Sequence, residues 1–245
     1  MSNKIVGLIP CRLESKRLKK KSLLILDGLP LIVHTYRRSM LSQKLDEVYV
    51  CTDSNKIIKV LKKYGCKYLK TKRNFNNGTE RIASVKKFFK NVKFFIDIQG
   101  DEPLVSPDDI DDVINFHKSN EKFDIVVPCI ETKKTYTKNI VKIIKSHNRV
   151  IYMTRLDAPC EFFKKTKYYK HLSVISFKPN ALLNFSKLKK GQIETIESIE
   201  LMRAIENNYQ IGTFESKSDS FSIDIKNDYL KAKRRIKKDK FRKFY

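Results

Sequence analysis

Short apolar runs alternate with amphipathic stretches along the first half of the chain. The runs are nearly continuous rather than alternating, which is typical of strands that are buried on both faces of a sheet. The stretches between them repeat apolar residues at helical spacing, and Ser54 and Gly65 supply the polar start and the glycine stop of one such helix. The expected strands are residues 4–9, 47–52, 66–69, 93–98 and 124–128, and the expected helices are residues 31–40, 54–64, 79–90 and one that begins at 106 or 107.

The pattern changes in the second half of the chain. Two β-like runs at 140–144 and 149–153 predict antiparallel strands added to the first sheet, and 171–177 predicts a strand that returns to its core. A helix is expected over 194–205, a strand over 210–214 and a last helix from about 227. No linker or repeat interrupts this order. The sequence therefore predicts one α/β domain over residues 1–245, with a doubly wound, mostly parallel sheet.

Composition narrows the class of protein. Hydrophobic residues make up 41% of the 245 residues, enough for a sizeable core and too many for a disordered chain. The longest apolar runs fall far short of the roughly 20 residues that span a bilayer. The first residues show no secretory signal. We expect a cytoplasmic protein with no membrane partner.

The net charge of +25 points toward a polyanionic partner when it is taken alone. Only 12 of the 52 basic residues are arginine, the residue that favours bidentate recognition of phosphates and bases. The lysines are spread over the whole chain, so we attribute them to general composition and expect no nucleic-acid partner. A non-catalytic polyanion-binding protein on the same scaffold is the alternative.

Polar and charged residues follow three of the predicted strands. The first strand leads to a basic loop with Arg12, Ser15, Arg17 and Lys21; the second leads to Thr52 and Asp53; and 93–98 leads to residues 99–102, which include Gln99 and Asp101. Ligands of open α/β sheets bind outside the carboxyl ends of the strands. Cations that neutralise phosphate and carboxylates that hold Mg²⁺ at one edge predict a site for a metal-chelated polyphosphate. Neither a G-x-G-x-x-G nor a P-loop motif is present, so side chains would hold the phosphates.

These residues also carry a family resemblance. The run from Pro10 to Leu18, followed by Lys21, resembles P-A-R-x-x-S-x-R-L-x-x-K, the signature loop of sugar-activating cytidylyltransferases. Four further segments resemble one branch, the 3-deoxy-manno-octulosonate (Kdo) cytidylyltransferases or CMP-Kdo synthetases. They are Gly78-Thr79-Glu80-Arg81, Gln99-Gly100-Asp101-Glu102-Pro103, His171-Leu172 before an apolar strand, and Glu194-x-x-Glu197-x-x-Glu200-x-x-Arg203. Their order and separations agree with the family along nearly all of the chain.

The resemblance implies a fold and a reaction. The fold would be the Rossmann-like sheet of nucleotide-diphospho-sugar transferases, with a β-rich dimerisation arm at about residues 135–153 of a homodimer. The reaction would join CTP and a 2-keto-3-deoxy sugar acid, Kdo or a close relative, into a CMP-sugar and pyrophosphate for lipopolysaccharide or capsule synthesis. Another acidic sugar, of the neuraminate type, is the alternative acceptor.

The resemblance also assigns roles to residues. Arg12, Lys21 and Asp101 would be catalytic, and Asp101 and Asp224 would bind the cofactor Mg²⁺. Gln99 would serve both substrates, and the three glutamates from Glu194 to Glu200 would lie along one helix flank. The nucleotide-binding residues would be Pro10, Arg12, Ser15, Arg17, Lys21, Thr52, Asp53, Asn77, Gly78, Thr79, Arg81 and Gln99, and the sugar-binding residues would be Gln99, Arg155, His171, Glu197, Glu200 and Arg203.

The chain departs from the family pattern at four places, one of which is Asp224-Ile225-Lys226-Asn227-Asp228, where the family reads D-T-P-x-D. The family loop reads L-P-G-K where this chain has Leu18-Lys19-Lys20-Lys21, so lysine replaces the glycine before Lys21. Asn77 stands where the family commonly has serine. The region of the family's S-R-A-P-I-P-W motif reads Thr154-Arg155-Leu156-Asp157-Ala158-Pro159, without tryptophan. The last two departures fall near the expected substrates, which leaves room for a related sugar acid.

Overall fold

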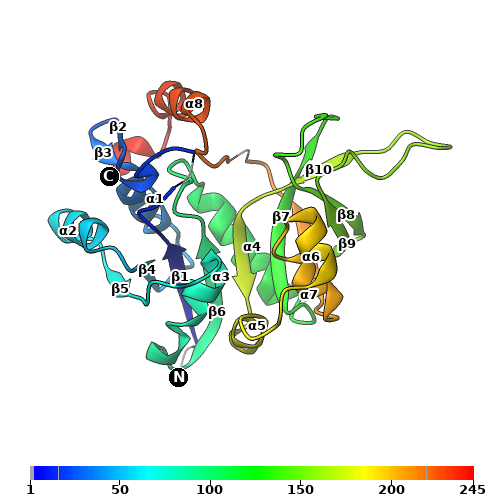
Figure 1. Cartoon of the computed structure of the whole chain (residues 1–245), viewed down its shortest axis with the longest axis horizontal. Coiled ribbons are helices and arrows are strands. Elements are labelled where there is room, and N and C mark those ends of the chain that lie inside the picture. Colours follow the sequence, from blue (N-terminus) through cyan, green and yellow to red (C-terminus); the bar gives the residue numbers. More distant parts are fainter. Residues whose placement is uncertain (1–2, 16, 219) are drawn as a thin grey trace.

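The computed structural model describes residues 3–15, 17–218 and 220–245, and Lys16 of the basic loop lies outside the described residues. One mixed sheet runs through the chain, with strand order β10-β8-β9-β12-β7-β11-β6-β1-β4-β5 (Figure 1). Its strands are β1 (Lys4–Pro10), β4 (Glu47–Thr52), β5 (Tyr68–Lys70), β6 (Val92–Ile98), β7 (Ile125–Thr132), β8 (Lys142–Ser146), β9 (Arg149–Thr154), β10 (Tyr168–His171), β11 (Val174–Phe177) and β12 (Ile211–Glu215). A two-stranded hairpin, β2 (Ile25–Leu26) and β3 (Leu29–Pro30), lies beside the sheet.

The sheet has a parallel half and an antiparallel extension. β5, β4, β1 and β6 pair in parallel, whereas β11 runs antiparallel to both of its neighbours. β8 and β9 form the antiparallel pair that the change of pattern in the second half predicts, and β10 extends this edge as a strand that the pattern did not predict. The predicted α/β class is confirmed.

Helices cover both faces of the sheet. On one face, α3 (Gly78–Ala83), α5 (Pro179–Phe185) and α7 (Met202–Glu206) supply residues to one apolar cluster. On the other, α1 (Leu31–Ser39), α2 (Asn55–Lys63) and α4 (Pro107–Ser119) supply a second. α8 (Lys226–Ile236) packs with the β2–β3 hairpin in a third. Two-sided cover explains why β1 and β6 are nearly continuous apolar runs.

Two predicted helices are shorter than their periodicity indicates. The helix expected over 79–90 ends at Ala83 and is followed by a 3-10 turn, η2 (Lys86–Phe88). The Ser84 hydroxyl donates to the Arg81 carbonyl at 2.7 Å and so competes with the helical ladder. Two further 3-10 turns, η1 (Lys21–Leu23) and η3 (Arg242–Phe244), lie near the ends of the chain.

The helix expected over 194–205 is two helices, α6 (Gln192–Glu197) and α7. Ser198 adopts a left-handed conformation with φ 53° and ends α6. The Arg155 guanidinium donates to the carbonyls of Glu197 and Ser198, which the broken helix leaves without helical partners. The expectation that three glutamates share one helix flank was therefore wrong.

The run at 171–177 also divides. His171 ends β10, and the returning strand, β11, begins only at Val174. β11 pairs with β6 and β7, so the predicted return to the core of the sheet is confirmed for its second part.

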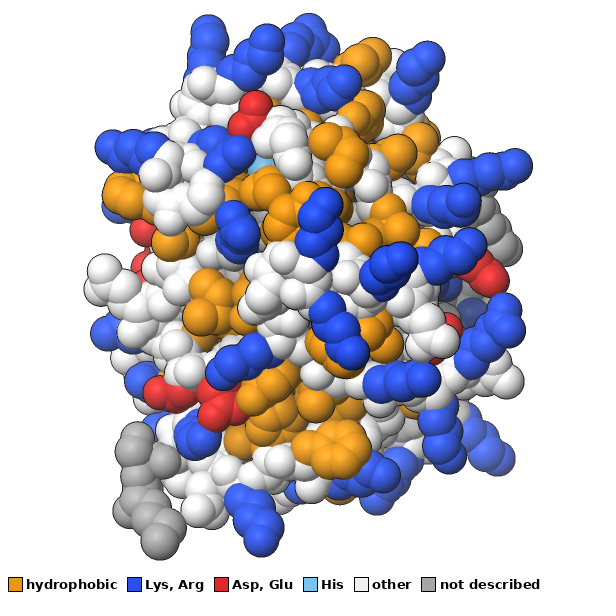
Figure 2. All heavy atoms as spheres, turned by 90° about the vertical axis from the view of Figure 1, so that its left-hand side faces the viewer, with side chains coloured by type: hydrophobic (Ala, Val, Ile, Leu, Met, Phe, Trp, Pro, Cys, Tyr) orange, Lys and Arg blue, Asp and Glu red, His pale blue; other side chains and the backbone are white. Residues whose placement is uncertain are grey.

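Basic side chains are scattered over one face of the molecule rather than gathered into a patch (Figure 2). Figure 2 shows lysine and arginine side chains spread over the whole of one face, with apolar side chains between them. This distribution agrees with a general compositional origin of the charge. No helix in the described part of the chain is long and apolar enough to cross a membrane.

A buried ion pair fastens the end of the chain to the domain. Arg38 is 1% exposed, and its Nη1 donates to Asp239 at 2.6 Å while its Nε donates to the Val105 carbonyl. Removal of the carboxylate would leave an uncompensated charge in the interior. In the neighbouring ion pair between Lys240 and Asp108, both side chains are exposed to solvent.

We predict that Asp239→Ala lowers the free energy of unfolding by about 3–5 kcal/mol, which is a fall in Tm of roughly 6–20 °C for a chain of this size. Lys240→Ala, the matched control, should leave Tm almost unchanged because an exposed pair contributes little. Thermal unfolding followed by circular dichroism measures both. Equal shifts for the two variants would contradict the account.

Candidate active site

Three segments that are far apart in sequence meet beyond the carboxyl ends of β1 and β6. Gly100, in the turn after β6, lies so close to the end of β1 that a Cβ there would stand 2.7 Å from the Pro10 carbonyl oxygen. The amide of Ile223 donates to the Asp101 carbonyl at 2.9 Å, which places Asp224 beside that turn. The predicted convergence of a basic loop with carboxylates from distant segments is confirmed.

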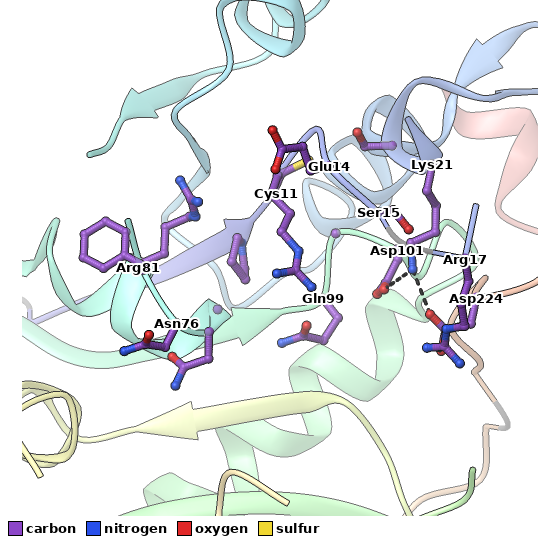
Figure 3. Close-up of a pocket in the computed structure, with 17 residues that line it drawn as sticks. Cys11, Glu14, Ser15, Arg17, Lys21, Asn76, Arg81, Gln99, Asp101 and Asp224 are labelled. Atoms are coloured by element: carbon purple, nitrogen blue, oxygen red, sulfur yellow. Dashed lines mark hydrogen bonds and ion pairs between the residues drawn. The ribbon is translucent and has the colours of Figure 1, made fainter. Parts of the chain in front are cut away.

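These segments enclose a cavity of about 430 Å³. Arg12, Lys21 and Asp101, the three predicted catalytic residues, all line it. In Figure 3, Lys21, Asp101, Asp224 and Arg17 gather at one end, Asn76 and Arg81 lie at the other, and Gln99 lies between them. The lining residues are Pro10, Cys11, Arg12, Glu14, Ser15, Arg17, Lys21, Ser22, Phe75, Asn76, Asn77, Gly78, Arg81, Gln99, Gly100, Asp101 and Asp224.

Lys21 bridges two carboxylates. Its Nζ lies 2.7 Å from Asp101 Oδ2 and 2.9 Å from Asp224 Oδ1, and Arg17 reaches the other Asp224 oxygen at 3.0 Å. Burial alone would lower the pKa of Lys21, but the charges of Asp101 and Asp224 and their hydrogen bonds raise it. Lys21 therefore stays protonated, and its ammonium group holds the two carboxylates close together.

The loop that carries Lys21 takes a glycine-like conformation without a glycine. Lys20 has φ 52° and ψ 35°, in the left-handed region, and stands where the family pattern has its glycine. Left-handed backbone costs a residue with a side chain about 1–2 kcal/mol. Lys20 therefore adopts a backbone conformation that a glycine at this position would take without that cost.

The opposite end of the cavity is built around the start of α3. Asn77 caps this helix, because its Oδ1 accepts from the Glu80 amide at 2.8 Å. Arg81 is fixed from behind by Asp53 at 2.7 Å and by the Thr71 hydroxyl, and its guanidinium lies over the Phe75 ring. Asp53 thus positions Arg81 instead of lining the cavity.

Several predicted nucleotide-binding residues do not line the cavity, and several lining residues are new. Thr52 is buried, with its hydroxyl accepting from the Ser54 amide, and Thr79 is buried in the first turn of α3. Phe75, Asn76, Glu14, Cys11 and Ser22 line the cavity, and sequence reasoning singled none of them out. Their only sequence signal was their position within or beside the motifs. Burial raises the pKa of Cys11 to about 12, so its thiol is not a nucleophile.

Three predicted sugar-binding residues make contacts within the protein. Arg203 is 4% exposed and forms a bidentate pair with the Glu194 carboxylate, both contacts at 2.7 Å. Glu197 accepts from the Thr154 hydroxyl and the Arg155 amide, and the Arg155 guanidinium donates to three backbone carbonyls. These side chains connect α6, α7 and β9, and none lines the cavity.

His171 and Glu200 each have one buried polar atom without a hydrogen-bond partner among the described residues. These atoms are His171 Nε2 and Glu200 Oε1. Burial and then the charge of Lys170 lower the pKa of His171 to about 4, and burial raises the pKa of Glu200 to about 7. Unpaired buried groups of this kind are candidates for contact with a ligand.

The carboxylates at Lys21 suit a divalent metal that is shared with a ligand. The described part of the chain holds no cluster of three or more His, Cys, Asp or Glu residues that could bind a metal ion by itself. Asp101 and Asp224 nevertheless offer hard oxygen atoms around one point, as their contacts with the Lys21 ammonium show. Mg²⁺ typically takes one or two carboxylates and completes its shell with phosphate oxygens and water. The residues therefore fit Mg²⁺.

An open α/β sheet with cations and paired carboxylates at its ligand-binding edge is typical of sites for metal-chelated polyphosphates. A family model described as cytidylyltransferase matches residues 6–216. Curated 3-deoxy-manno-octulosonate cytidylyltransferases from Leptospira interrogans and Chlorobium phaeobacteroides strain BS1 are each 34% identical to this chain; the first match covers 93% of this chain and 94% of the relative, and the second covers 96% and 98%. The chain belongs to the cytidylyltransferase family, in the branch of the 3-deoxy-manno-octulosonate cytidylyltransferases.

Solved structures agree with this assignment. The structure of a CMP:2-keto-3-deoxy-manno-octonic acid synthetase complexed with CTP superimposes with a TM-score of 0.91 at 26% identity, over 96% of this chain and 99% of that one. A cytidylyltransferase from Leptospira borgpetersenii has a TM-score of 0.67 at 16% identity, which shows the shared fold.

The Lys20 conformation generates a prediction. Lys20→Val places a β-branched residue in the left-handed region, where it costs about 1–3 kcal/mol, and we expect kcat/KM to fall about tenfold as Lys21 is displaced. Lys20→Gly, the matched variant at the same position, should keep full activity. Steady-state kinetics with CTP measures both, and full activity of the valine variant would show that the loop conformation does not matter.

Proposed function

We propose that this protein transfers the cytidylyl group of CTP to Kdo or a close relative, a 2-keto-3-deoxy sugar acid. The anomeric hydroxyl oxygen forms a bond to the α-phosphorus and loses its proton. The bond from that phosphorus to the β-phosphate bridging oxygen breaks, and pyrophosphate leaves with the electron pair. The products are the CMP-sugar and pyrophosphate.

One observation carries this proposal: Lys21, Asp101 and Asp224 meet in a cavity that Arg12 also lines. Phosphoryl-group transfer of this kind depends on positioning and on electrostatic stabilisation more than on covalent chemistry. Permanent cations beside the place where charge gathers on the leaving pyrophosphate are what such a transition state requires. The relatives' names supply the identity of the substrates.

The two ends of the cavity suit the two ends of CTP. Lys21, Arg12 and Arg17 would neutralise the triphosphate, and the end formed by Asn77, Gly78 and Arg81 would hold the nucleoside. The cavity of about 430 Å³ lies within the range of small-molecule sites. The side chains of Asp101 and Asp224 would hold Mg²⁺, which would supply charge neutralisation on the phosphate oxygens when it is bound.

The acceptor would enter on the side of Gln99, Glu200 and His171. Gln99 lines the cavity, and the other two offer the unpaired buried atoms described above. A neutral imidazole and a glutamate with a pKa near 7 can exchange hydrogen bonds with sugar hydroxyls without a fixed charge.

We propose further that the protein works in the cytoplasm as a homodimer, and that its product serves lipopolysaccharide or capsule synthesis. The antiparallel extension supports the dimer, because it exposes large apolar side chains on and beside the predicted arm at 135–153. They are Tyr136, Ile151, Leu156, Phe162 and Phe163. Exposed apolar clusters of this kind mark association surfaces.

The function is tested by pyrophosphate release. Purified protein with CTP should release pyrophosphate only when a suitable acceptor is added, and Kdo should support turnover better than neuraminate-like acids. ATP, GTP and UTP serve as nucleotide controls. No release with Kdo, its amino variants or nonulosonic acids would overturn the proposal.

The metal assignment is tested at Asp101. Asp101→Asn should lower kcat by about 10²–10³-fold, the scale for loss of one electrostatic group at a transition state, with Tm nearly unchanged. Asp108→Asn, an exposed carboxylate in the first turn of α4, is the matched control and should retain full activity. EDTA should abolish wild-type turnover, and added Mg²⁺ should restore it. Turnover that survives EDTA, or an active Asp101→Asn variant, would remove the metal from the account.

A further inference from the structure

Asp97 is a carboxyl group in the middle of the apolar strand β6. It is 0% exposed, and its neighbours in the sheet are Leu8 of β1 and Ile175 of β11. Both neighbours belong to the apolar cluster that α3, α5 and α7 cover. A carboxyl group in such surroundings is costly unless its hydrogen bonds compensate for the loss of water.

Among the described residues Asp97 has one hydrogen bond, and its partner is a residue that lines the cavity. Gln99, two residues further along the same face of the chain, donates from Nε2 to Asp97 Oδ1 at 3.1 Å. Gln99 itself lines the cavity, midway between its two ends (Figure 3). Asp97 Oδ2 is buried without a hydrogen-bond partner among the described residues. The buried carboxyl therefore faces the site through Gln99.

The charge state of Asp97 suits an anionic ligand nearby. Burial, followed by the charges of Glu200 and Asp101, raises the pKa of Asp97 well above its usual range. Close carboxyl groups in a desolvated place cannot all be ionised, so Asp97 and Glu200 together carry less than their full charge. The carboxyl groups of Asp97 and Glu200 therefore repel only weakly a sugar acid that approaches Gln99.

A glutamine amide can face a ligand with either a donor or an acceptor, and its surroundings decide which. Because one N–H of Nε2 donates to Asp97, the amide is held with its nitrogen toward Asp97, and Oε1 is its free acceptor. An acceptor at this point suits the hydroxyl groups of a sugar.

We propose that Asp97 is a positioning residue that fixes the Gln99 amide with Oε1 toward the cavity, where it accepts a hydrogen bond from a hydroxyl group of the acceptor sugar. This inference rests on the proposed function, and it adds a residue that the family motifs do not include. The fixed Gln99 amide would favour binding of the sugar by the side that carries its hydroxyl groups.

The test compares variants at position 97. Asp97→Val has a similar shape but accepts no hydrogen bond, so KM for the acceptor should rise about 5- to 20-fold, the range for loss of one buried hydrogen bond. KM for CTP should stay within about twofold. Asp97→Asn keeps an acceptor oxygen toward Gln99 and should restore the wild-type KM. Ile175→Val, a packing change on the strand opposite, should lower Tm without any effect on either KM.

Acceptor binding in the presence of a non-hydrolysable CTP analogue, measured by calorimetry, gives a readout that is independent of turnover. If Asp97→Val does not fold, Asp97→Ala serves in its place. An unchanged KM for the acceptor in the apolar variant, or equal changes in KM for CTP and for the acceptor, would overturn the role of Asp97. If the wild-type enzyme is active in the same assays, the proposed function still stands. A wild-type enzyme that uses no acceptor would overturn both.

Discussion

The site depends on one ion cluster, the ammonium of Lys21 between the carboxylates of Asp101 and Asp224. The three residues come from the start, the middle and the end of the chain. The cluster holds the basic loop against the β6 turn, and the backbone bond from Ile223 to Asp101 holds the third segment in register. Like charges that would repel one another in isolation are thereby kept together around one ammonium group.

The nucleotide half of the site could be predicted because its residues lie at strand ends. The chain order of strand, proline and basic loop places Arg12 and Lys21 at the ligand-binding edge of any parallel sheet, and the same rule places Asp101 there. The placement of Asp224 required the resemblance, since its sequence context is only that of a residue before a helix. Its position depends on a backbone hydrogen bond that no periodicity reveals.

The acceptor half was harder to predict because it depends on tertiary contacts. The spacing Glu194, Glu197, Glu200, Arg203 is typical of one helix, yet that helix is divided at Ser198, where Arg155, the residue after β9, donates to the carbonyls of Glu197 and Ser198. From the sequence, Arg203 was predicted to bind the ligand. In the structure it forms an ion pair with Glu194 inside the protein. Asp97 carried a usable signal, a lone acid within the apolar run Phe94-Phe95-Ile96-Asp97-Ile98, and it gains meaning only through its bond to Gln99.

The central claim is that the Lys21, Asp101 and Asp224 cluster surrounds a metal-bound triphosphate. A crystal structure with CTP and Mn²⁺, with the metal located by anomalous scattering, tests this most directly. The account predicts a manganese peak in contact with the carboxylates of Asp101 and Asp224, with Lys21 turned to a phosphate oxygen. A peak elsewhere, or a triphosphate bound away from these three side chains, would contradict it.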